Sequence, residues 1–302
     1  MHNIYRAPNV TTEVLTVDMA AALPPRVSVC IPTYRGAPFI AATIRSVLAQ
    51  SFREFELIVV DDNSPDNTCE IVAGISDPRL RLVRASPNLG AEGNWNRCLS
   101  EARGEYIKLL PQDDLLHPDC LKRQVDVLDE DRSTSLALVF CARRIIDSKD
   151  KAFFTRGYPI SSDCRISRRV LIRNTIRSGA NLVGEPGAVL FRRSASNAVG
   201  KFDASISYVV DVDYWVRLLT MGDAYYLCAP LASFRVSAIS WSVAIGSRQI
   251  SQYWQFIDRV AKAYPTCSSA VDRVSGRVRA TFNTLLRMVF YRLVVPRAKR
   301  DK

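Results

Sequence analysis

Residues 57–66 read Leu-Ile-Val-Val-Asp-Asp-Asn-Ser-Pro-Asp, an apolar, β-rich run that ends abruptly in two adjacent acids and a turn. Residues 105–114 read Glu-Tyr-Ile-Lys-Leu-Leu-Pro-Gln-Asp-Asp and repeat this design. The separation of the two runs corresponds to one or two βα units. Because ligands of open α/β sheets bind beyond the carboxyl ends of the strands, these two acid-tipped strands predict a site for a nucleotide and a metal.

Strand and helix patterns alternate along the first half of the chain. Apolar runs predict strands at 27–31, 56–60, 80–84, 105–110 and 136–140, and helices are predicted between them at 38–50, 66–74, 91–102 and 118–128. A polar, charged stretch follows at 143–169, and a further strand is expected at 188–191. The alternation predicts an α/β fold with a mostly parallel central sheet and helices on both faces. No GxGxxG turn opens the first helix, so a dinucleotide-binding Rossmann domain is not expected.

Composition favours a globular protein in a reducing compartment. Of the 302 residues 48% are hydrophobic, which is ample for a large core. The eight cysteines are scattered without a CxxC pair, which is typical of a reduced, cytoplasmic protein, and His2 and His117 alone do not make a zinc site. Residues 1–25 lack the pattern of a signal peptide and are expected to form a flexible leader. No apolar run is long enough to span a bilayer.

The net charge of +11 is concentrated at the C-terminus, where residues 270–302 hold nine Lys or Arg and two Asp. Residues 246–302 are predicted to form a helical extension with a basic amphipathic tail. Its apolar face comprises Val278, Phe282, Leu285, Leu286, Val289, Phe290 and Leu293, with Arg287 opposite. Two readings stay open: the helix docks on the catalytic domain, or it lies on the inner face of the plasma membrane as a peripheral anchor. Nucleic acid is not an expected partner, because no binding motif accompanies the charge.

Several motifs in order along residues 26–240 resemble the family 2 glycosyltransferases. They are Val29-Cys-Ile-Pro-Thr-Tyr34, Ser46-Val-Leu-Ala-Gln50, Val59-Val-Asp-Asp-Asn-Ser64, Asn88-Leu-Gly90 with Asn96, Gly104-Glu-Tyr-Ile, Gln112-Asp-Asp114, Gly184-Glu-Pro-Gly187 and Asp211-Val-Asp-Tyr-Trp-Val-Arg217. Each motif is weak alone, but their order and spacing make the resemblance strong.

The resemblance implies the GT-A nucleotide-diphospho-sugar transferase fold over residues 26–245. The nucleotide half would cover about 26–115 and the acceptor half about 116–245. The implied activity is transfer of a sugar from a nucleotide-diphospho-sugar to an acceptor hydroxyl with inversion. A UDP-sugar is the first expectation for the donor, and a glycan or lipid-linked molecule for the acceptor, in polysaccharide or other cell-surface glycan synthesis.

The donor side follows from the same resemblance. Asp113 matches the last acid of the family's DxD motif and is the expected ligand of Mg²⁺ or Mn²⁺, while Pro111 stands where the first acid usually sits. Asp61 is expected to accept a hydrogen bond from the base, although Asp62 and Ser64 beside it also suit turn chemistry. The remaining expected nucleotide-binding residues are Pro32, Thr33, Tyr34, Asn88, Gly90 and Gln112.

The acceptor side depends on Asp211, which matches the acid of the family's Glu-Asp pair, with Val210 in place of the Glu. Asp211 is the expected catalytic base, and the alternative is that it only caps the following helix. Of these two acids, Asp213 is the one expected to be structural. Asp114 and Glu185 are expected near the donor or acceptor sugar, although Asp114 also suits a helix cap and Glu185 an ordinary turn.

One further departure concerns the segment 234–237, where many relatives carry Arg-x-His and this chain has Ser237 instead of the His. With Pro111 and Val210, this departure keeps a second hypothesis open. In that hypothesis the chain is a glycosyltransferase-like protein that binds sugar nucleotides or acts as a scaffold without turnover.

Overall fold

The computed structural model describes residues 24–236, 246 and 248–294. Most of the predicted leader, the basic residues after 294 and Ser237 therefore lie outside the described residues.

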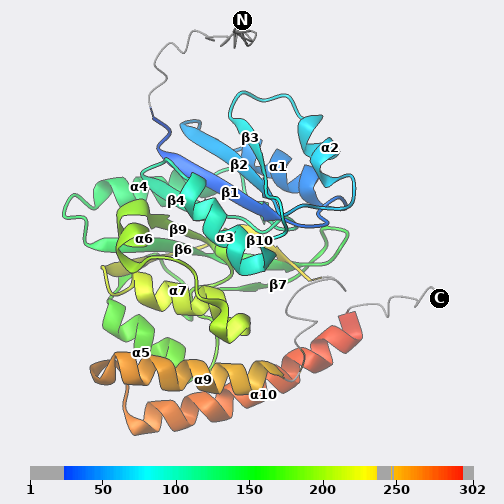
Figure 1. Ribbon diagram of the computed structural model, residues 1–302. Coiled ribbons are helices and arrows are strands. Elements are labelled where there is room, and N and C mark those ends of the chain that lie inside the picture. Colours follow the sequence, from blue (N-terminus) through cyan, green and yellow to red (C-terminus); the bar gives the residue numbers. More distant parts are fainter. Residues whose placement is uncertain (1–23, 237–245, 247, 295–302) are drawn as a thin grey trace, which may run out of the picture.

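A single ten-stranded sheet forms the centre of the molecule (Figure 1). Its first half is parallel, in the order β3 (Leu80–Arg84), β2 (Phe55–Asp61), β1 (Val27–Thr33) and β4 (Tyr106–Leu109). The second half begins with β9 (Val189–Arg192), which runs antiparallel to both β4 and β6 (Leu136–Ile146). The long β10 (Asp223–Arg235) pairs with β6 in parallel, and the short edge strands are β5 (Leu115–Leu116), β7 (Ala152–Arg156) and β8 (Cys164–Ile166).

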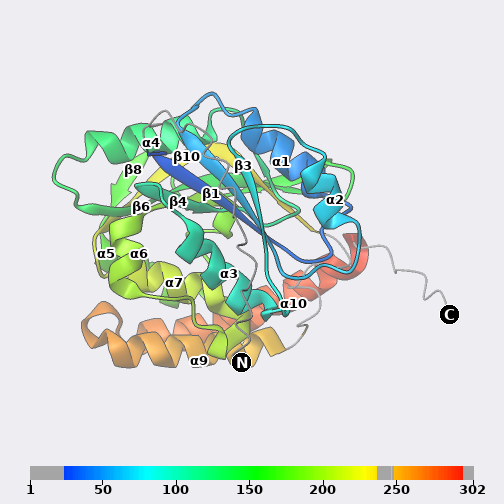
Figure 2. The same cartoon turned by 45° about the horizontal axis from the view of Figure 1, so that its top comes forward.

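Helices cover both faces of the sheet, as the alternating pattern predicted (Figure 2). One core includes residues of α1 (Ile40–Leu48), α2 (Thr68–Ala73) and α4 (Cys120–Glu130). The other includes residues of α3 (Gly90–Glu101), α5 (Arg168–Ser178), α6 (Arg193–Val199) and α7 (Val210–Leu218). Successive strand residues point to opposite faces, so Cys30 belongs to the second core while Val29 and Ile31 belong to the first. Short 3₁₀ helices in the described part of the chain lie at Pro186–Ala188, Ala204–Val209 and Pro265–Cys267.

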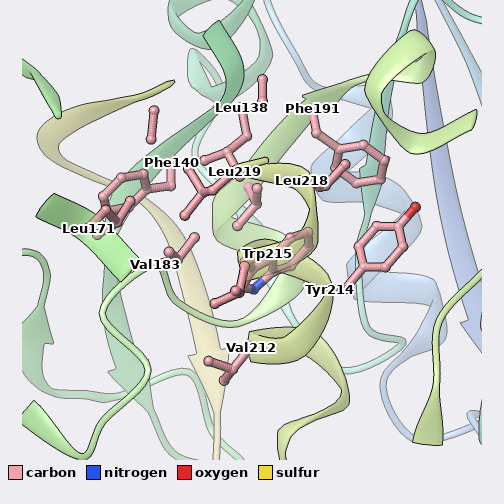
Figure 3. Packing of buried hydrophobic residues seen from close by; sticks show 14 of the residues in the cluster. Leu138, Phe140, Leu171, Val183, Phe191, Val212, Tyr214, Trp215, Leu218 and Leu219 are labelled. Carbon is pink, nitrogen blue, oxygen red and sulfur yellow. The ribbon is translucent and has the colours of Figure 1, made fainter. Parts of the chain in front are cut away.

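The second core is centred on Trp215 of α7, which is fully buried (Figure 3). Around it lie side chains from β6, β9 and α5, including Phe140, Phe191 and Leu171. The Phe191 ring lies 5.9 Å from the Trp215 ring. Burial of this aromatic cluster fixes α7 against the sheet, and with it the position of the N-terminus of α7.

The polar, charged stretch at 143–169, to which the sequence assigned no helix or strand, is largely structured. This stretch contains the end of β6, the whole of β7 and β8, and the start of α5. The charges misled the prediction because Arg143 is buried within β6, where it pairs with Glu185. A charged side chain can lie in a buried strand when it has a partner of opposite charge. From sequence alone such a side chain is expected to be exposed to solvent.

The C-terminal extension docks on the catalytic domain through α9 (Arg248–Ala263) and α10 (Ala270–Val294). In Figure 1 these two helices lie side by side beneath α5. The docking face of α10 is made of small and polar residues: Gly276 touches the backbone of Ile176, and Asn283 Nδ2 donates to the carbonyl of Ser178 at 3.1 Å. The backbone of α10 therefore lies in direct contact with the backbone of α5, and larger side chains on the docking face would prevent this contact.

The apolar side of α10 faces outward. We call it the outer stripe, and it consists of Val271, Val274, Val278, Phe282, Leu285, Val289 and Leu293, which are 48–81% exposed. Of the two readings open from sequence, docking is therefore correct for the helix, but through the face opposite the one that a simple amphipathic helix would use. No described helix has both the length and the apolar character needed to cross a membrane.

We expect Gly276→Val to push α10 away from α5, because a side chain at this position would overlap the Ile176 carbonyl. Overpacking of this kind costs about 1–3 kcal/mol of unfolding free energy. The measurement is thermal unfolding, with Arg279→Val at an exposed position of the same helix as the control. Equal melting temperatures of the two variants would contradict the docked position of α10.

Candidate functional site

A cavity of about 1180 Å³ lies beyond the carboxyl ends of β1, β2 and β4, and α10 forms part of its far side. It brings together residues from both predicted halves of the catalytic domain. The predicted site residues that line it are Pro32, Thr33, Tyr34, Asn88, Gly90, Gln112, Asp113, Glu185 and Asp211. Asp61 and Asp114 are not among the lining residues.

Gln112, which follows β4, holds this segment against the end of β1. Its Oε1 accepts hydrogen bonds from the Thr33 hydroxyl and from Tyr34 N (2.9 Å), and its Nε2 donates to the Tyr34 carbonyl at 3.1 Å. Gly36 completes this packing, because a side chain there would collide with Thr33 and Gln112. The wall formed by residues 32–34 is thus held by side-chain bonds, which leaves the Tyr34 ring 42% exposed beside the cavity.

Asp61 and Asp62 occupy different positions. Asp61 is the last residue of β2 and is fully buried; its Oδ2 accepts from Ser64 N at 2.9 Å, and its Oδ1 has no hydrogen-bond partner among the described residues. Asp62 lines the cavity, and its Oδ1 accepts from Leu89 N at 2.6 Å. Its carbonyl accepts from Asn88 Nδ2 at 2.7 Å.

The strand register explains why the two acids differ. Thr33 pairs with Asp61, so Asp62 is the first residue beyond the paired strands. Sequence reasoning favoured Asp61 for the base contact, while the lining of the cavity favours Asp62, with Asp61 directly behind it. The unsatisfied Oδ1 of Asp61 is a costly feature in a buried position, which is typical of a functional region.

Asp113 and Asp114 also face different ways. Asp113 is partly buried at the cavity, its carbonyl accepts from Arg235 Nε at 2.7 Å, and burial raises the pKa of its carboxyl group. The carboxyl group of Asp114 turns into the protein, where Oδ1 accepts from the backbone N–H of Arg235 at 2.9 Å. Burial and the nearby Asp113 raise the pKa of Asp114 well above its ordinary value. The carboxyl group of Asp114 therefore does not line the cavity, and it holds the end of β10.

Asp113 provides one carboxylate that could bind a divalent cation. No described basic side chain forms an ion pair with it, and a cation would relieve the cost of burying its charge. Within the described ranges no three His, Cys, Asp or Glu side chains gather into a metal cluster. A single carboxylate together with phosphate oxygens and water matches the way that Mg²⁺ is usually bound.

Asp211 lies in the first turn of α7 and faces the cavity. Its Oδ2 accepts from Asn181 Nδ2 at 2.9 Å, and its Oδ1 accepts from Val212 N at 2.8 Å. Burial and the nearby Glu185 raise its pKa to about 7. The second acid of this turn, Asp213, instead bonds Arg217 Nε at 2.9 Å and does not line the cavity.

The turn at Gly184 and Glu185 positions Asp211. The Gly184 carbonyl accepts from Trp215 Nε1 and from Asn181 Nδ2, both at 3.0 Å, and Gly184 has a φ of 111°, which favours glycine. Glu185 accepts from Arg143 Nε. Burial alone would raise the pKa of Glu185, but Arg143 and Arg156 lower it. Glu185 therefore remains ionised and makes ionisation of Asp211 more difficult.

Sequence reasoning missed several residues of this side of the cavity. Asn181 lies in an irregular segment before Gly184 and carries no motif signal. Arg143, Arg156 and Arg287 line the cavity from β6, β7 and α10, and the first two lie in the stretch that the sequence described only as polar and charged. The sequence places Arg287 opposite the apolar face of α10, but only the docking of α10 shows that Arg287 points toward the cavity.

The model of the family described as Glycosyl transferase family 2 matches residues 28–200, which is more than half of the chain. A protein of Mycobacterium tuberculosis (strain CDC 1551 / Oshkosh), named as uncharacterised, is 37% identical over 219 residues, covering 70% of this chain and 66% of that protein. The chondroitin synthase of Escherichia coli is 29% identical over 66% of this chain and 27% of that enzyme. The chain spans less than two thirds of the length of the first curated relatives that it matches.

Solved structures share the fold. S. aureus TarS 1–349 in complex with UDP-GlcNAc has a TM-score of 0.63 at 17% identity, over 88% of this chain and 73% of that chain. The mannosyltransferase PcManGT from Pyrobaculum calidifontis, in complex with GDP-Man and Mn²⁺, has a TM-score of 0.62 at 20% identity, over 89% and 76%. The expected GT-A fold is confirmed, and the match of the family model shows that the chain belongs to glycosyl transferase family 2.

Proposed function

We propose that the protein is a metal-dependent, inverting glycosyltransferase that moves a sugar from a nucleotide-diphospho-sugar to an acceptor hydroxyl. The observation that carries this proposal is that Asp113 and Asp211, from the two halves of the domain, line one cavity. Asp113 would hold the cation that binds the diphosphate of the donor, and Asp211 would accept the proton of the acceptor hydroxyl.

The strand ends would hold the donor. Asp62, backed by Asp61, offers a hydrogen-bond acceptor to the base, and the exposed Tyr34 ring offers a stacking surface. Asn88 and Gly90 border the same wall. Asp113 would hold Mg²⁺ or Mn²⁺ when bound, and such a cation stabilises the negative charge of a leaving nucleoside diphosphate.

Asp211 would remove the proton of the acceptor hydroxyl. In an inverting transfer the hydroxyl oxygen attacks the anomeric carbon from the face opposite the diphosphate, and the proton passes to a base on the acceptor side. A base acts best when its pKa lies near the working pH, and the pKa of Asp211 is about 7. Asn181 and Val212 N hold both carboxylate oxygens in place, so Asn181 is a positioning residue.

Similarity to known proteins supports the classes of donor and acceptor. One structural neighbour was solved with UDP-GlcNAc and another with GDP-Man and Mn²⁺, so nucleotide-sugars of two bases suit this fold. A UDP-sugar remains the first expectation. Similarity to chondroitin synthase supports an acceptor in polysaccharide or cell-surface glycan synthesis.

We expect calorimetric titration to detect binding of one of UDP, GDP and dTDP that depends on Mn²⁺. Asp113→Ala should remove the metal dependence, because Asp113 is the cavity carboxylate that we assign to the cation. Asp211→Asn is the matched control: it should keep nucleotide binding but lose transfer of sugar, since it removes only the base.

The opposite results would contradict the proposal in two ways. Absence of binding for every nucleotide, with and without Mn²⁺, would exclude the donor site. Nucleotide binding without turnover by the wild-type protein on a broad panel of acceptors would favour the second hypothesis, a binding or scaffold protein, to which Pro111 and Val210 point.

We also propose that the outer stripe of α10 rests on an anionic membrane surface, which would place the enzyme on the inner face of the plasma membrane. Seven large apolar side chains form one exposed face there, and Arg279 and Arg292 flank it at helical spacing. Arginines beside an apolar helical face attract anionic lipid while the apolar side chains enter the interface.

We expect the protein to sediment with vesicles that contain phosphatidylglycerol, and Val278→Ser with Phe282→Ser to weaken this binding by more than about tenfold, because two apolar anchors are lost. Val170→Ser is the control, since Val170 is 48% exposed on α5, outside the stripe. If the double variant instead dissociates a dimer and leaves vesicle binding unchanged, the stripe binds a second copy of the chain and the membrane proposal is wrong.

A further inference from the structure

The acceptor side of the cavity carries more positive charge than the reaction described above requires. Arg143, Arg156 and Arg287 line it, with Glu185 and Asp211 as the nearby acids. Arg143 already has a partner, because it pairs with Glu185. The other two guanidinium groups come from β7 and α10, which are far apart in sequence, and both line this cavity.

Among the described residues no carboxylate forms an ion pair with Arg156 or Arg287, although the charge of Glu185 acts on both. In the part of the chain that the structure describes, Arg156 makes neither an ion pair nor a hydrogen bond through its guanidinium group. Arg287 donates to the neutral Oε1 of Gln249 at 2.7 Å and lies 5.6 Å from the centre of the Tyr208 ring. Burial lowers the pKa of both arginines, and the charge of Glu185 opposes this effect at each of them. At Arg287 the charge of Arg156 adds to the effect of burial.

Such an arrangement is unfavourable in the ligand-free protein. A partly desolvated cation is normally balanced by an anion, and Glu185 is already engaged by Arg143. The arrangement becomes favourable when a ligand supplies the missing negative charge, since guanidinium groups bind phosphate oxygens through paired hydrogen bonds.

Apolar side chains adjoin the two arginines. Phe154 is 45% exposed and Leu286 is 54% exposed, yet both line the cavity. The Phe290 ring also lines it and packs edge-on at 5.7 Å against both Phe153 and Phe154. On α10 this apolar wall continues through Leu285 and Val289 into the outer stripe. A positively charged position that suits an anion therefore lies next to an apolar path that leads out of the cavity.

We propose that Arg156 and Arg287 bind a phosphate or diphosphate group of the acceptor, and that an apolar chain on the same acceptor lies against Phe154, Leu286 and Phe290. The acceptor is thus a phosphorylated amphiphile, such as a sugar carried on a lipid phosphate. This inference rests on the proposed transferase function and names the acceptor class of the same cavity.

The test uses farnesyl phosphate as a probe, with farnesol and inorganic phosphate as the two partial probes. Binding to the full-length protein is measured by calorimetry in the presence of saturating UDP or GDP. We expect farnesyl phosphate to bind at least about tenfold more tightly than either partial probe, because only it carries both the charge and the chain. Binding in the presence of nucleotide would distinguish this subsite from the diphosphate site of the donor.

Variants assign the two parts of the subsite. Arg156→Gln and Arg287→Gln should each weaken farnesyl phosphate binding by about tenfold or more, and Phe154→Ser should weaken it without changing the response to inorganic phosphate. Arg144→Gln, at an exposed position of β6, is the matched control. Arg156 makes no hydrogen bond through its guanidinium group, so Arg156→Gln is expected to fold. If Arg287→Gln does not fold, Arg287→Lys is measured in its place.

Two results would overturn the proposal. If Arg156→Gln and Arg287→Gln bind farnesyl phosphate as well as the wild type does, the arginines do not form this subsite. If nucleotide displaces farnesyl phosphate completely, or the same variants weaken UDP or GDP instead, the arginines serve the donor diphosphate. Failure of all nucleotide binding would instead count against the transferase function, whatever the response to farnesyl phosphate.

Discussion

The arrangement of the acceptor side depends on the hydrogen bonds that meet at the Gly184 carbonyl. Trp215, buried in the core, donates to this oxygen from α7, and Asn181 donates to it from the preceding segment. Asn181 also donates to Asp211, so one side chain joins the turn to the proposed base. Packing of Trp215 against the sheet thereby holds Asp211 in a buried position close to Glu185. Burial, and then the charge of Glu185, raise the pKa of Asp211.

The arginines around this turn have two different effects. Arg143 keeps Glu185 ionised, and the ionised Glu185 makes the proton of Asp211 harder to lose. Arg156 and Arg287 contribute positive charge without a carboxylate of their own among the described residues. Docking of α10 through its small, polar face brings Arg287 into the cavity and leaves the outer stripe exposed. The C-terminal extension thus lines the cavity, whereas its sequence suggested only that it docks on the domain or lies on a membrane.

The first half of the fold could be predicted because its strands are apolar runs bounded by turn residues, and β3 was predicted with its observed bounds, Leu80–Arg84. The second half was harder. Arg143 lies inside β6 because Glu185, which is distant in sequence, neutralises it, and no local pattern reveals such a pair. Asp62 could have been preferred to Asp61 from the pairing of Thr33 with Asp61, but strand register requires the structure. Asn181 gave no signal at all, since its role depends on where Gly184 and Asp211 meet.

The central claim is that Asp211 acts as the base with a pKa of about 7. The most direct test is the pH dependence of kcat/KM for sugar transfer, which reports ionisation of the free enzyme. Because the base must be deprotonated, activity should fall by about tenfold for each pH unit below 7 and reach a plateau above it. A profile that stays level from pH 5 to 8, or that bends only near the ordinary pKa of an aspartate at about 4, would contradict this account.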